Sequence, residues 1–294
     1  MSRFGLYLVE LLNRWFPPLD IHRQLDAAKL SDRDYQRRGY AEAARICPVF
    51  GDLWDVEDKY VLDVGGGLGE KSAYCVDQGA RMAISLDLRL YSSKAALAWT
   101  RERQQAQAIC PIVADAARMP LADRRLDVVL SVNTFEHLED VRGALIECKR
   151  VLKPQGLIFL HFPPFYSPWG AHLEGWINFP WPHVFFSDRV LIQAAQRVEA
   201  RRRKNEDFIA PAKVDWAHAE RLPDLNRVTA RQFLRLVRVL DLKLIEARML
   251  PFGWRYFATH GPLAHALLAV LKRLATLPLL REVLTTKMVF VLAK

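Results

Sequence analysis

The sequence predicts an α/β fold, in which a mostly parallel sheet is covered by helices on both faces. Strand-like and helix-like patterns alternate from residue 59 onward, which is typical of parallel strands joined by helices. A glycine-rich segment at 65–69 follows the first apolar run and precedes a helical pattern, and an acid, Asp87, ends the next apolar run. Both features fall at the carboxyl ends of strands, where ligands bind in open α/β sheets.

Seven strand patterns can be placed in order along the chain. These short apolar runs, bounded by turn residues, are expected at residues 60–64, 81–86, 109–113, 126–132, 157–162, 242–250 and 287–293. Helical patterns are expected at residues 70–78, 92–107, 141–152, 187–206 and 229–240. Gly79 suits the C-terminal cap of the first of these helices. Pro154 and Gly156 mark a stop after the third.

The chain is expected to divide into four segments. Residues 1–56 have the pattern of helices packed outside the sheet, and residues 57–162 form its cofactor-binding core. Residues 163–241 form a substrate-binding insertion after the fifth strand. Residues 242–294 hold the last two strands, with an apolar helical stretch between them.

The first part of the insertion, residues 163–186, is crowded with Pro, Trp, Phe, Gly and His and is called here the aromatic segment. It emerges at the carboxyl edge of the sheet, and loops of this length are usually functional. We therefore predict a lid or substrate wall that lines an apolar pocket with Phe165, Tyr166, Trp169, Trp176 and Trp181. A small satellite core beneath a long loop is the alternative.

Composition excludes several classes of protein. Of 294 residues, 51% are hydrophobic and 26% are charged, which is typical of globular domains and not of disordered or coiled-coil chains. Four scattered cysteines form no Cys-x-x-Cys pair, so we expect a reducing, cytoplasmic location without a zinc ribbon or disulfide framework. No apolar run is long enough to span a bilayer. Glu10 and Arg14 interrupt the apolar N-terminus, so a signal peptide is not expected.

The net charge of +9 is unevenly distributed. Residues 188–294 carry 20 basic and 10 acidic side chains, so the excess lies in the last third. Such a surface could serve an acidic substrate, an anionic membrane or nucleic acid, or could simply be solvated. Two apolar stretches with interspersed Lys and Arg, 4–16 and 263–284, could lie at the inner face of a membrane. Packing against the sheet is the commoner role of such helices.

The glycine-rich loop and its neighbouring acids predict a nucleoside site. The glycines of 65–69 let a ligand approach the backbone closely, and the helix that follows offers unpaired N–H groups. Asp87 lies 18 residues after Gly69, close to the spacing of the acid that binds ribose in dinucleotide sites. Asp63 lies inside the preceding strand end, where a buried carboxylate must be paired and would disfavour phosphates. A cationic nucleoside with an amino group suits these acids better than a dinucleotide.

The order of these motifs resembles that of the class I S-adenosylmethionine-dependent methyltransferases, a group that includes the ubiquinone-pathway methyltransferases. VLDVGGGLGE resembles their first motif and ISLDLRL their second, while VADAARMPLADRRLDVVLSVNTFEHLED resembles the third and fourth. ECKRVLKPQGLIFL resembles the helix, turn and fifth strand that follow. The resemblance covers about residues 57–162. It implies a Rossmann-like, seven-stranded sheet with S-adenosyl-L-methionine as cofactor and S-adenosyl-L-homocysteine as its product.

The resemblance also implies a set of cofactor-binding residues, namely Asp63, Gly65, Gly66, Gly67, Gly69, Asp87, Leu88, Asp115, Ala116 and Asn133. Asp63 and the glycines would border the methionine part of the cofactor. Asp87 would bind both ribose hydroxyls, and Asp115 with the backbone of Ala116 would bind the adenine. Asn133, at the end of the fourth strand, would lie near the sulfonium.

A general base is needed only where the methyl acceptor is a protonated hydroxyl or amine. The candidates are histidines, which titrate near neutrality: His137 after the fourth strand, and His172 and His183 in the aromatic segment. His137 could equally cap the helix that follows it. No metal is expected, because His172, Glu174 and His183 match no standard ligand spacing.

We expect methyl transfer to a small-molecule or amphiphilic acceptor, such as a lipid-linked compound, a glycan or a specialised metabolite, more readily at oxygen than at nitrogen or carbon. A nucleic-acid methyltransferase is the first alternative, favoured by the basic last third. Against it, the segment Asn133 to Glu136 lacks the motif of adenine-N6 enzymes, and no cysteine is placed as a pyrimidine-C5 nucleophile. A non-catalytic cofactor-binding subunit is the second alternative, and the intact glycines and acids argue against it.

Overall fold

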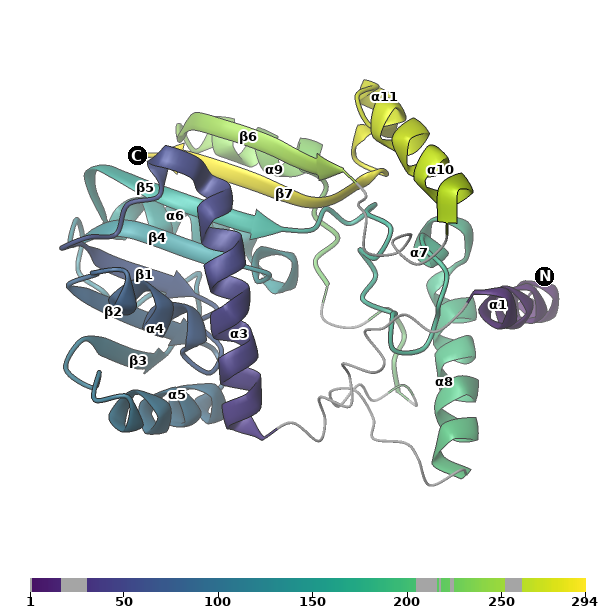
Figure 1. Ribbon diagram of the computed structural model, residues 1–294, viewed down its shortest axis with the longest axis horizontal. Helices are drawn as coiled ribbons and strands as arrows, with labels where there is room; N and C mark the ends of the chain where they lie inside the picture. The colour runs from purple at the N-terminus through teal and green to yellow at the C-terminus, as the bar shows by residue number, and fades with distance from the viewer. Residues whose placement is uncertain (1, 17–30, 205–215, 217, 223–224, 252–260) are drawn as a thin grey trace. The chain divides into compact units, whose positions relative to one another are not determined.

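The structure is a computed structural model that describes residues 2–16, 31–204, 216, 218–222, 225–251 and 261–294 (Figure 1). The chain divides into two compact units. The first, called here the sheet unit, comprises Ser31–Phe162, Ala230–Arg248 and Met288–Lys294. The second, called here the insertion unit, comprises Met1–Leu30, Pro163–Thr229 and Met249–Lys287. The first of the four expected segments contributes residues to both units. The division into four segments stays a prediction.

The sheet has seven strands in the order β3-β2-β1-β4-β5-β7-β6. They are β1 (Tyr60–Val64), β2 (Met82–Asp87), β3 (Ile109–Val113), β4 (Leu126–Val132), β5 (Leu152–Phe162), β6 (Lys243–Pro251) and β7 (Thr285–Ala293). Strands β1 to β5 pair in parallel, while β7 runs antiparallel to β5. The expected seven-stranded, mostly parallel sheet is therefore confirmed.

Burial explains why the apolar runs form the central strands. In β1 every residue after Tyr60 is buried, and β4 is buried almost throughout, as expected of parallel strands covered on both faces. Strand β3 lies at the edge of the sheet. An edge position tolerates Pro111, which has no N–H to donate to a neighbouring strand.

Helices cover both faces of the sheet, as predicted. In the sheet unit they are α3 (Asp32–Ile46), α4 (Glu70–Asp77), α5 (Leu90–Glu102), α6 (Val141–Val151) and α9 (Ala230–Val239), with 3₁₀ helices η2 (Cys47–Leu53) and η3 (Phe135–His137). Figure 1 shows α3 and α4 in front of the sheet and α6 and α9 behind it. The ring centroid of Phe233 in α9 lies 5.1 Å from that of Phe162 and 4.8 Å from that of Phe290. This aromatic cluster joins α9 to β5 and β7.

One expected turn is part of a strand. Helix α6 ends at Val151, close to the predicted end, but β5 begins at Leu152 and includes residues 153–156. The pairing with β4 shifts there, because Leu126 faces Leu152 whereas Val128 faces Leu157. The Pro and Gly of this segment therefore form a bulge, a place where a sheet accommodates both residue types.

The insertion unit has a hydrophobic core of its own. Its helices are α1 (Ser2–Trp15), α7 (Pro182–Phe185), α8 (Asp188–Lys204), α10 (Gly261–Leu274) and α11 (Pro278–Arg281). The apolar stretch expected at 262–284 is thus divided between α10 and α11. Buried side chains of α1, α8 and the aromatic segment pack together, among them Leu6, Val9, Ile177 and Leu191. Within the described parts of the chain, no helix is both long and apolar enough to cross a membrane.

Candidate functional site

The glycine loop lies at the carboxyl end of β1. Gly65 and Gly67 have φ angles of +75° and +55°, which glycine adopts without strain. The N–H groups of Gly65 and Gly66 donate to the carbonyl of Leu86 in β2, at 2.8 and 2.9 Å. A Cβ added at Gly65 would lie 2.1 Å from Thr134 Oγ1. The loop is therefore held closely between the ends of β2 and β4, with no room for a side chain at its first position.

Asp87 ends β2 with a carboxylate that the chain itself orients. Its side chain is only 10% exposed. Oδ2 accepts a hydrogen bond from the N–H of Gly67 at 3.2 Å, and Oδ1 accepts from the N–H and Nε of Arg89 at 2.9 and 3.4 Å. A carboxylate offers about four lone-pair sites, so it can still accept bonds from a ligand. The geometry joins the acid to the glycine loop and suits a pair of neighbouring hydroxyl groups.

Three charged side chains are buried where α4 begins, next to the loop. Asp63 is fully buried, and its Oδ2 accepts from Ser72 Oγ at 2.9 Å. Glu70, the residue after the cap Gly69, accepts from Lys71 Nζ at 3.1 Å through Oε1. Oδ1 of Asp63 and Oε2 of Glu70 have no hydrogen-bond partner among the described residues. Two unpaired carboxylate oxygens beside the loop fit an ammonium group, and sequence reasoning identified only the first of these acids.

Burial sets the protonation of this trio. It raises the pKa of Asp63 to about 6, with Glu70 and Asp87 adding to the shift and Lys71 and Ser72 opposing it. Burial alone would lower the pKa of Lys71, but attraction to Glu70 and Asp63 outweighs it, so that pKa is raised. The lysine is therefore charged near neutral pH, and Asp63 ionises reluctantly beside it.

The variant Asp63→Asn should raise the free energy of unfolding of the ligand-free protein above pH 6, by on the order of 1–3 kcal/mol. In the wild type the folded pKa of about 6 lies above the ordinary 3.8. The stability contributed by this group is therefore highest below pH 4, falls as the pH rises to 6 and stays low above that. Urea unfolding of both proteins at pH 4.5 and pH 8 measures the difference. A difference of equal size at the two pH values would contradict the raised pKa.

The residues expected to bind adenine, Asp115 and Ala116, follow β3. Asp115 is exposed, and its Oδ1 accepts from the N–H of Ala117 at 2.9 Å, which forms an Asx turn. Ala116 is buried. Leu88 and Val113, directly after Asp87 and at the end of β3, are both exposed apolar residues. An apolar wall near an orienting carboxylate is suited to a flat ring with an amino group.

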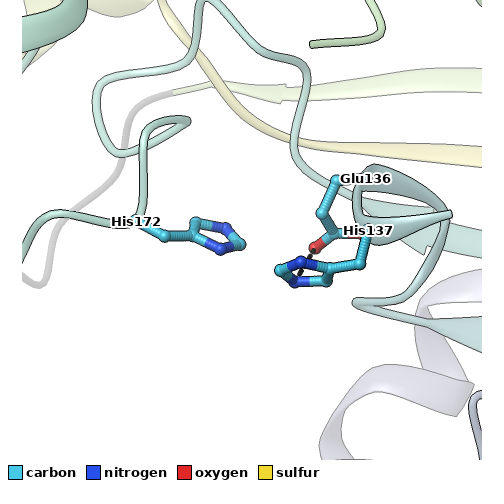
Figure 2. Close-up of side chains that lie close together, drawn as sticks. All are labelled: Glu136, His137 and His172. Atoms are coloured by element: carbon cyan, nitrogen blue, oxygen red, sulfur yellow. Dashed lines mark ion pairs between the residues drawn. The ribbon is translucent and has the colours of Figure 1, made fainter. Parts of the chain in front are cut away.

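The residues that follow β4 include His137, which belongs to the sheet unit, as the glycine loop does. Asn133 has a φ of +54°, which asparagine tolerates better than most residues, and its N–H donates to the carbonyl of His161 at 2.8 Å. His137, on η3, is exposed, and its Nε2 lies 3.9 Å from Oε1 of the buried Glu136 (Figure 2). The accessible imidazole of His137 is therefore the candidate general base of the sheet unit.

Gln36 in α3 is a positioning residue that the sequence patterns do not reveal. It is buried, and its Nε2 donates to the carbonyl of Leu68 in the glycine loop at 3.0 Å. The same atom lies 3.3 Å from the carbonyl of Ala95 in α5. One side chain therefore joins α3, the loop and α5. The contact spans 32 residues, and no local pattern indicates it.

The expected substrate wall belongs to the insertion unit. Trp176 is only 6% exposed and packs edge-on against Trp216, with ring centroids 4.9 Å apart, in the core of this unit. Trp169 and Trp181 are half-buried. Tyr166 is 42% exposed. Phe165 is half-buried as well, so Tyr166 is the most accessible of the five predicted wall residues.

The two remaining candidate bases also belong to the insertion unit. His183 Nε2 lies 2.7 Å from the carbonyl of Phe165, and the two rings are in edge contact. Burial lowers the pKa of His183 to about 4, so its imidazole is neutral near pH 7. His172 is half-buried, and its backbone N–H donates to the carbonyl of Trp169 at 3.0 Å. Burial raises the pKa of nearby Glu174 to about 7. The expectation that these residues hold no metal stays a prediction.

Fold and site together define a class of protein. A glycine loop after β1 and an orienting acid after β2, in a sheet of this order, are typical of a nucleoside-binding α/β domain. Residues 62–160 also match the sequence model of a family described as "Methyltransferase domain". These residues are therefore a class I S-adenosylmethionine-dependent methyltransferase domain, as the motifs predicted.

Individual proteins similar to this chain agree with that assignment. An uncharacterized methyltransferase of Mycobacterium leprae (strain Br4923) is 31% identical over 153 residues, which are 49% of this chain and 54% of that protein. The chloroplastic tocopherol O-methyltransferase of Arabidopsis thaliana is 29% identical over 137 residues, 46% of this chain and 39% of that protein. The chain thus spans about half the length of the curated relatives it matches.

A solved structure shares the fold over most of the chain. Geranyl diphosphate C-methyltransferase from Streptomyces coelicolor A3(2), in complex with Mg²⁺, geranyl diphosphate and S-adenosyl-L-homocysteine, is similar with a TM-score of 0.54. The match covers 86% of this chain and 76% of that chain at 13% sequence identity. At this identity the similarity is one of fold.

Proposed function

We propose that the protein is an enzyme that transfers the methyl group of S-adenosyl-L-methionine to a small-molecule or amphiphilic acceptor, at oxygen. The observation that carries the proposal is the hydrogen bond from the N–H of Gly67 to Asp87. It fixes the acid that we expect to bind the ribose against the glycine loop of a methyltransferase domain. The loop glycines and the three acids Asp63, Asp87 and Asp115 are all present, which argues against a subunit that has lost its activity.

The sheet unit offers a partner for each part of the cofactor. Asp87 would accept hydrogen bonds from the ribose hydroxyls, and the exposed wall after β2 and β3 would receive the adenine. The unpaired oxygens of Asp63 and Glu70 would accept from the ammonium of the methionine part. Asn133, directly after β4, would lie near the sulfonium. When bound, the cofactor supplies an activated methyl group on a positively charged sulfur, which becomes a neutral thioether after transfer.

His137 is the general base that we favour for an acceptor hydroxyl. It belongs to the same unit as the residues proposed to bind the cofactor, and its side chain is exposed. The pKa of His183, about 4, makes that residue a weaker base. His172 stays as the alternative. The remaining task of the protein is to orient the acceptor and exclude water.

An amphiphilic acceptor is supported by two observations. The segment after β5 is rich in aromatic residues, and such residues line sites for apolar or ring-bearing ligands. The similarity to a tocopherol O-methyltransferase supports a hydroxyl on a molecule with a long apolar chain. A cytoplasmic enzyme with peripheral contact to the inner face of a membrane is consistent with such an acceptor, and its location stays a prediction.

Tyr166→Ala should lower kcat/KM for the acceptor by roughly tenfold, the size expected for loss of one aromatic contact. The affinity for S-adenosyl-L-homocysteine should not change, because Tyr166 is not among the residues expected to bind the cofactor. Initial rates at varied acceptor concentration give kcat/KM, and calorimetry gives the cofactor affinity as the control. An unaltered rate would argue against the substrate wall. Trp176→Ala is a poor probe, because removal of a buried tryptophan typically costs about 3–5 kcal/mol of stability.

A tracing experiment tests the proposed function. The purified protein is incubated with methyl-labelled cofactor and a lysate of its source, and label is counted in four fractions. Label in organic-soluble material supports an amphiphilic acceptor, and label in the aqueous small-molecule pool supports a polar one. Label in nucleic acid would overturn the proposal and favour the basic surface as a nucleic-acid site. A parallel incubation with the Asp87→Ala protein controls for transfer by other enzymes of the lysate.

A further inference from the structure

Helix α1 carries apolar side chains on two opposite faces. Its inner face is occupied: Leu6 and Val9 are buried, and Leu12 and Phe16 pack partly against the same core. This core includes residues of α8, so α1 is fixed to that helix. Packing within the insertion unit therefore accounts for one of the two apolar faces.

The outer face of α1 is exposed and aromatic. Phe4, Tyr7 and Trp15 are 73%, 63% and 79% exposed. Positions 4, 7, 11 and 15 follow one another at spacings of three and four residues, so their side chains lie along one face of the helix. The residue at position 11 is the partly exposed Leu11. Isolated exposed apolar residues need no explanation, but a continuous row of them marks an interaction surface.

The charges beside this row are basic. Glu10 is the one acid of α1, and its Oε1 lies 3.2 Å from Arg197 Nη1 and 3.1 Å from Arg201 Nη2, both in α8. This acid is therefore neutralised within the unit. Arg14, next to Trp15, is exposed. Of the α8 side chains that the structure describes, all three arginines are exposed, whereas both acids are at least half-buried. The described surface of the helix pair is therefore cationic.

We propose that α1 binds an anionic membrane surface, with Phe4, Tyr7 and Trp15 in the interface. The exposed arginines of the two helices, Arg14, Arg189, Arg197 and Arg201, would lie near the lipid headgroups. Amphiphilic aromatic rings are favoured at the boundary between headgroups and acyl chains, and basic side chains are attracted to anionic lipids. A helix with an aromatic face and basic flanks combines both features. The inference goes beyond methyl transfer, since it uses neither the cofactor-binding residues nor the identity of the acceptor.

A second copy of the chain is the main competing occupant of this face. Two copies that met through α1 would bring like-charged helix pairs together, which is unfavourable. An anionic bilayer would instead be complementary in charge as well as in apolar character. Charge complementarity therefore favours the membrane.

Vesicle sedimentation with the full-length protein tests the proposal. Wild-type protein should bind vesicles of phosphatidylcholine with about 30% phosphatidylglycerol at least about tenfold more tightly than vesicles of phosphatidylcholine alone, and added salt should weaken the binding. The triple variant Phe4→Gln, Tyr7→Gln, Trp15→Gln should lose about tenfold or more in affinity. The matched control replaces three exposed apolar residues of the sheet unit, Val239→Gln, Leu244→Gln and Ile245→Gln, and should bind like wild type.

Three results would overturn the proposal: no binding of wild type to anionic vesicles, equal binding to both kinds of vesicle, or binding by the α1 variant that matches wild type. Light scattering of both proteins detects self-association. A wild-type dimer that the α1 variant abolishes, without vesicle binding, would assign the face to a second copy. The affinity of each variant for S-adenosyl-L-homocysteine shows that it is folded and separates this test from that of the proposed enzyme activity.

Discussion

Replacement of Asp87 by alanine should weaken the binding of S-adenosyl-L-homocysteine by at least about 100-fold. Each hydrogen bond from a ribose hydroxyl to a carboxylate is expected to contribute roughly 1.5–3 kcal/mol. Loss of two such bonds corresponds to roughly 3 kcal/mol or more, which exceeds a factor of 100 in Kd. The fold should persist, since among the contacts described the carboxylate of Asp87 bonds only Gly67 and the exposed Arg89. Isothermal titration calorimetry measures the affinities of the wild type and of the Asp87→Ala variant for S-adenosyl-L-homocysteine.

Asp127→Ala is the matched control for this variant. Asp127 is also an acid of the parallel sheet, but it lies near the start of β4. It accepts from the N–H of Tyr60 at 3.0 Å and from Lys153 Nζ at 2.8 Å. Its loss should lower stability and leave the ligand affinity unchanged. If the Asp87→Ala protein bound as tightly as wild type, the assignment of this acid to the ribose would be wrong.

Gly65→Ala should both destabilise the protein and abolish ligand binding. The residue has a φ of +75°, and its added Cβ would lie 2.1 Å from Oγ1 and 2.3 Å from Cγ2 of Thr134. Backbone strain and overpacking together typically cost roughly 2–5 kcal/mol. Relief of the clash would move the loop away from the end of β2, where the N–H of Gly65 donates to Leu86. Thermal unfolding and calorimetry measure the two losses.

The double variant Gly65→Ala, Thr134→Gly separates the clash from the strain. Removal of the threonine side chain leaves the positive φ but opens the space next to the new Cβ. The double variant should therefore regain part of the stability that Gly65→Ala alone loses. If it were no more stable than Gly65→Ala, the close approach to β4 would not be the cause of the loss.

The parallel core could be predicted from the sequence because its strands are apolar on both faces. The expected strands at 60–64, 109–113 and 126–132 agree with β1, β3 and β4 residue for residue. The bulge in β5 could not be predicted in the same way, because Pro154 and Gly156 occur in turns and in bulges alike. The division of the last apolar stretch follows from Pro278, which begins α11.

The candidate site was predictable where it depends on local motifs and not where it depends on distant contacts. The glycine loop and Asp87 follow from the spacing of one strand, one turn and the next strand. Gln36 and Glu70 did not stand out, because a buried glutamine or glutamate has no periodic pattern and is recognised only by its partners. Trp176 is the reverse case. The aromatic composition of its segment predicted a place in the substrate wall, whereas its side chain is buried in the core of the insertion unit.

Calorimetric titration of the wild type with S-adenosyl-L-homocysteine and, separately, with NAD⁺ tests the central claim most directly. The buried acids Asp63 and Glu70 beside the loop should accept an ammonium group and repel phosphates. We expect one molecule of S-adenosyl-L-homocysteine to bind per chain and NAD⁺ to give no measurable binding. Failure of S-adenosyl-L-homocysteine to bind, or equally tight binding of NAD⁺, would contradict the account.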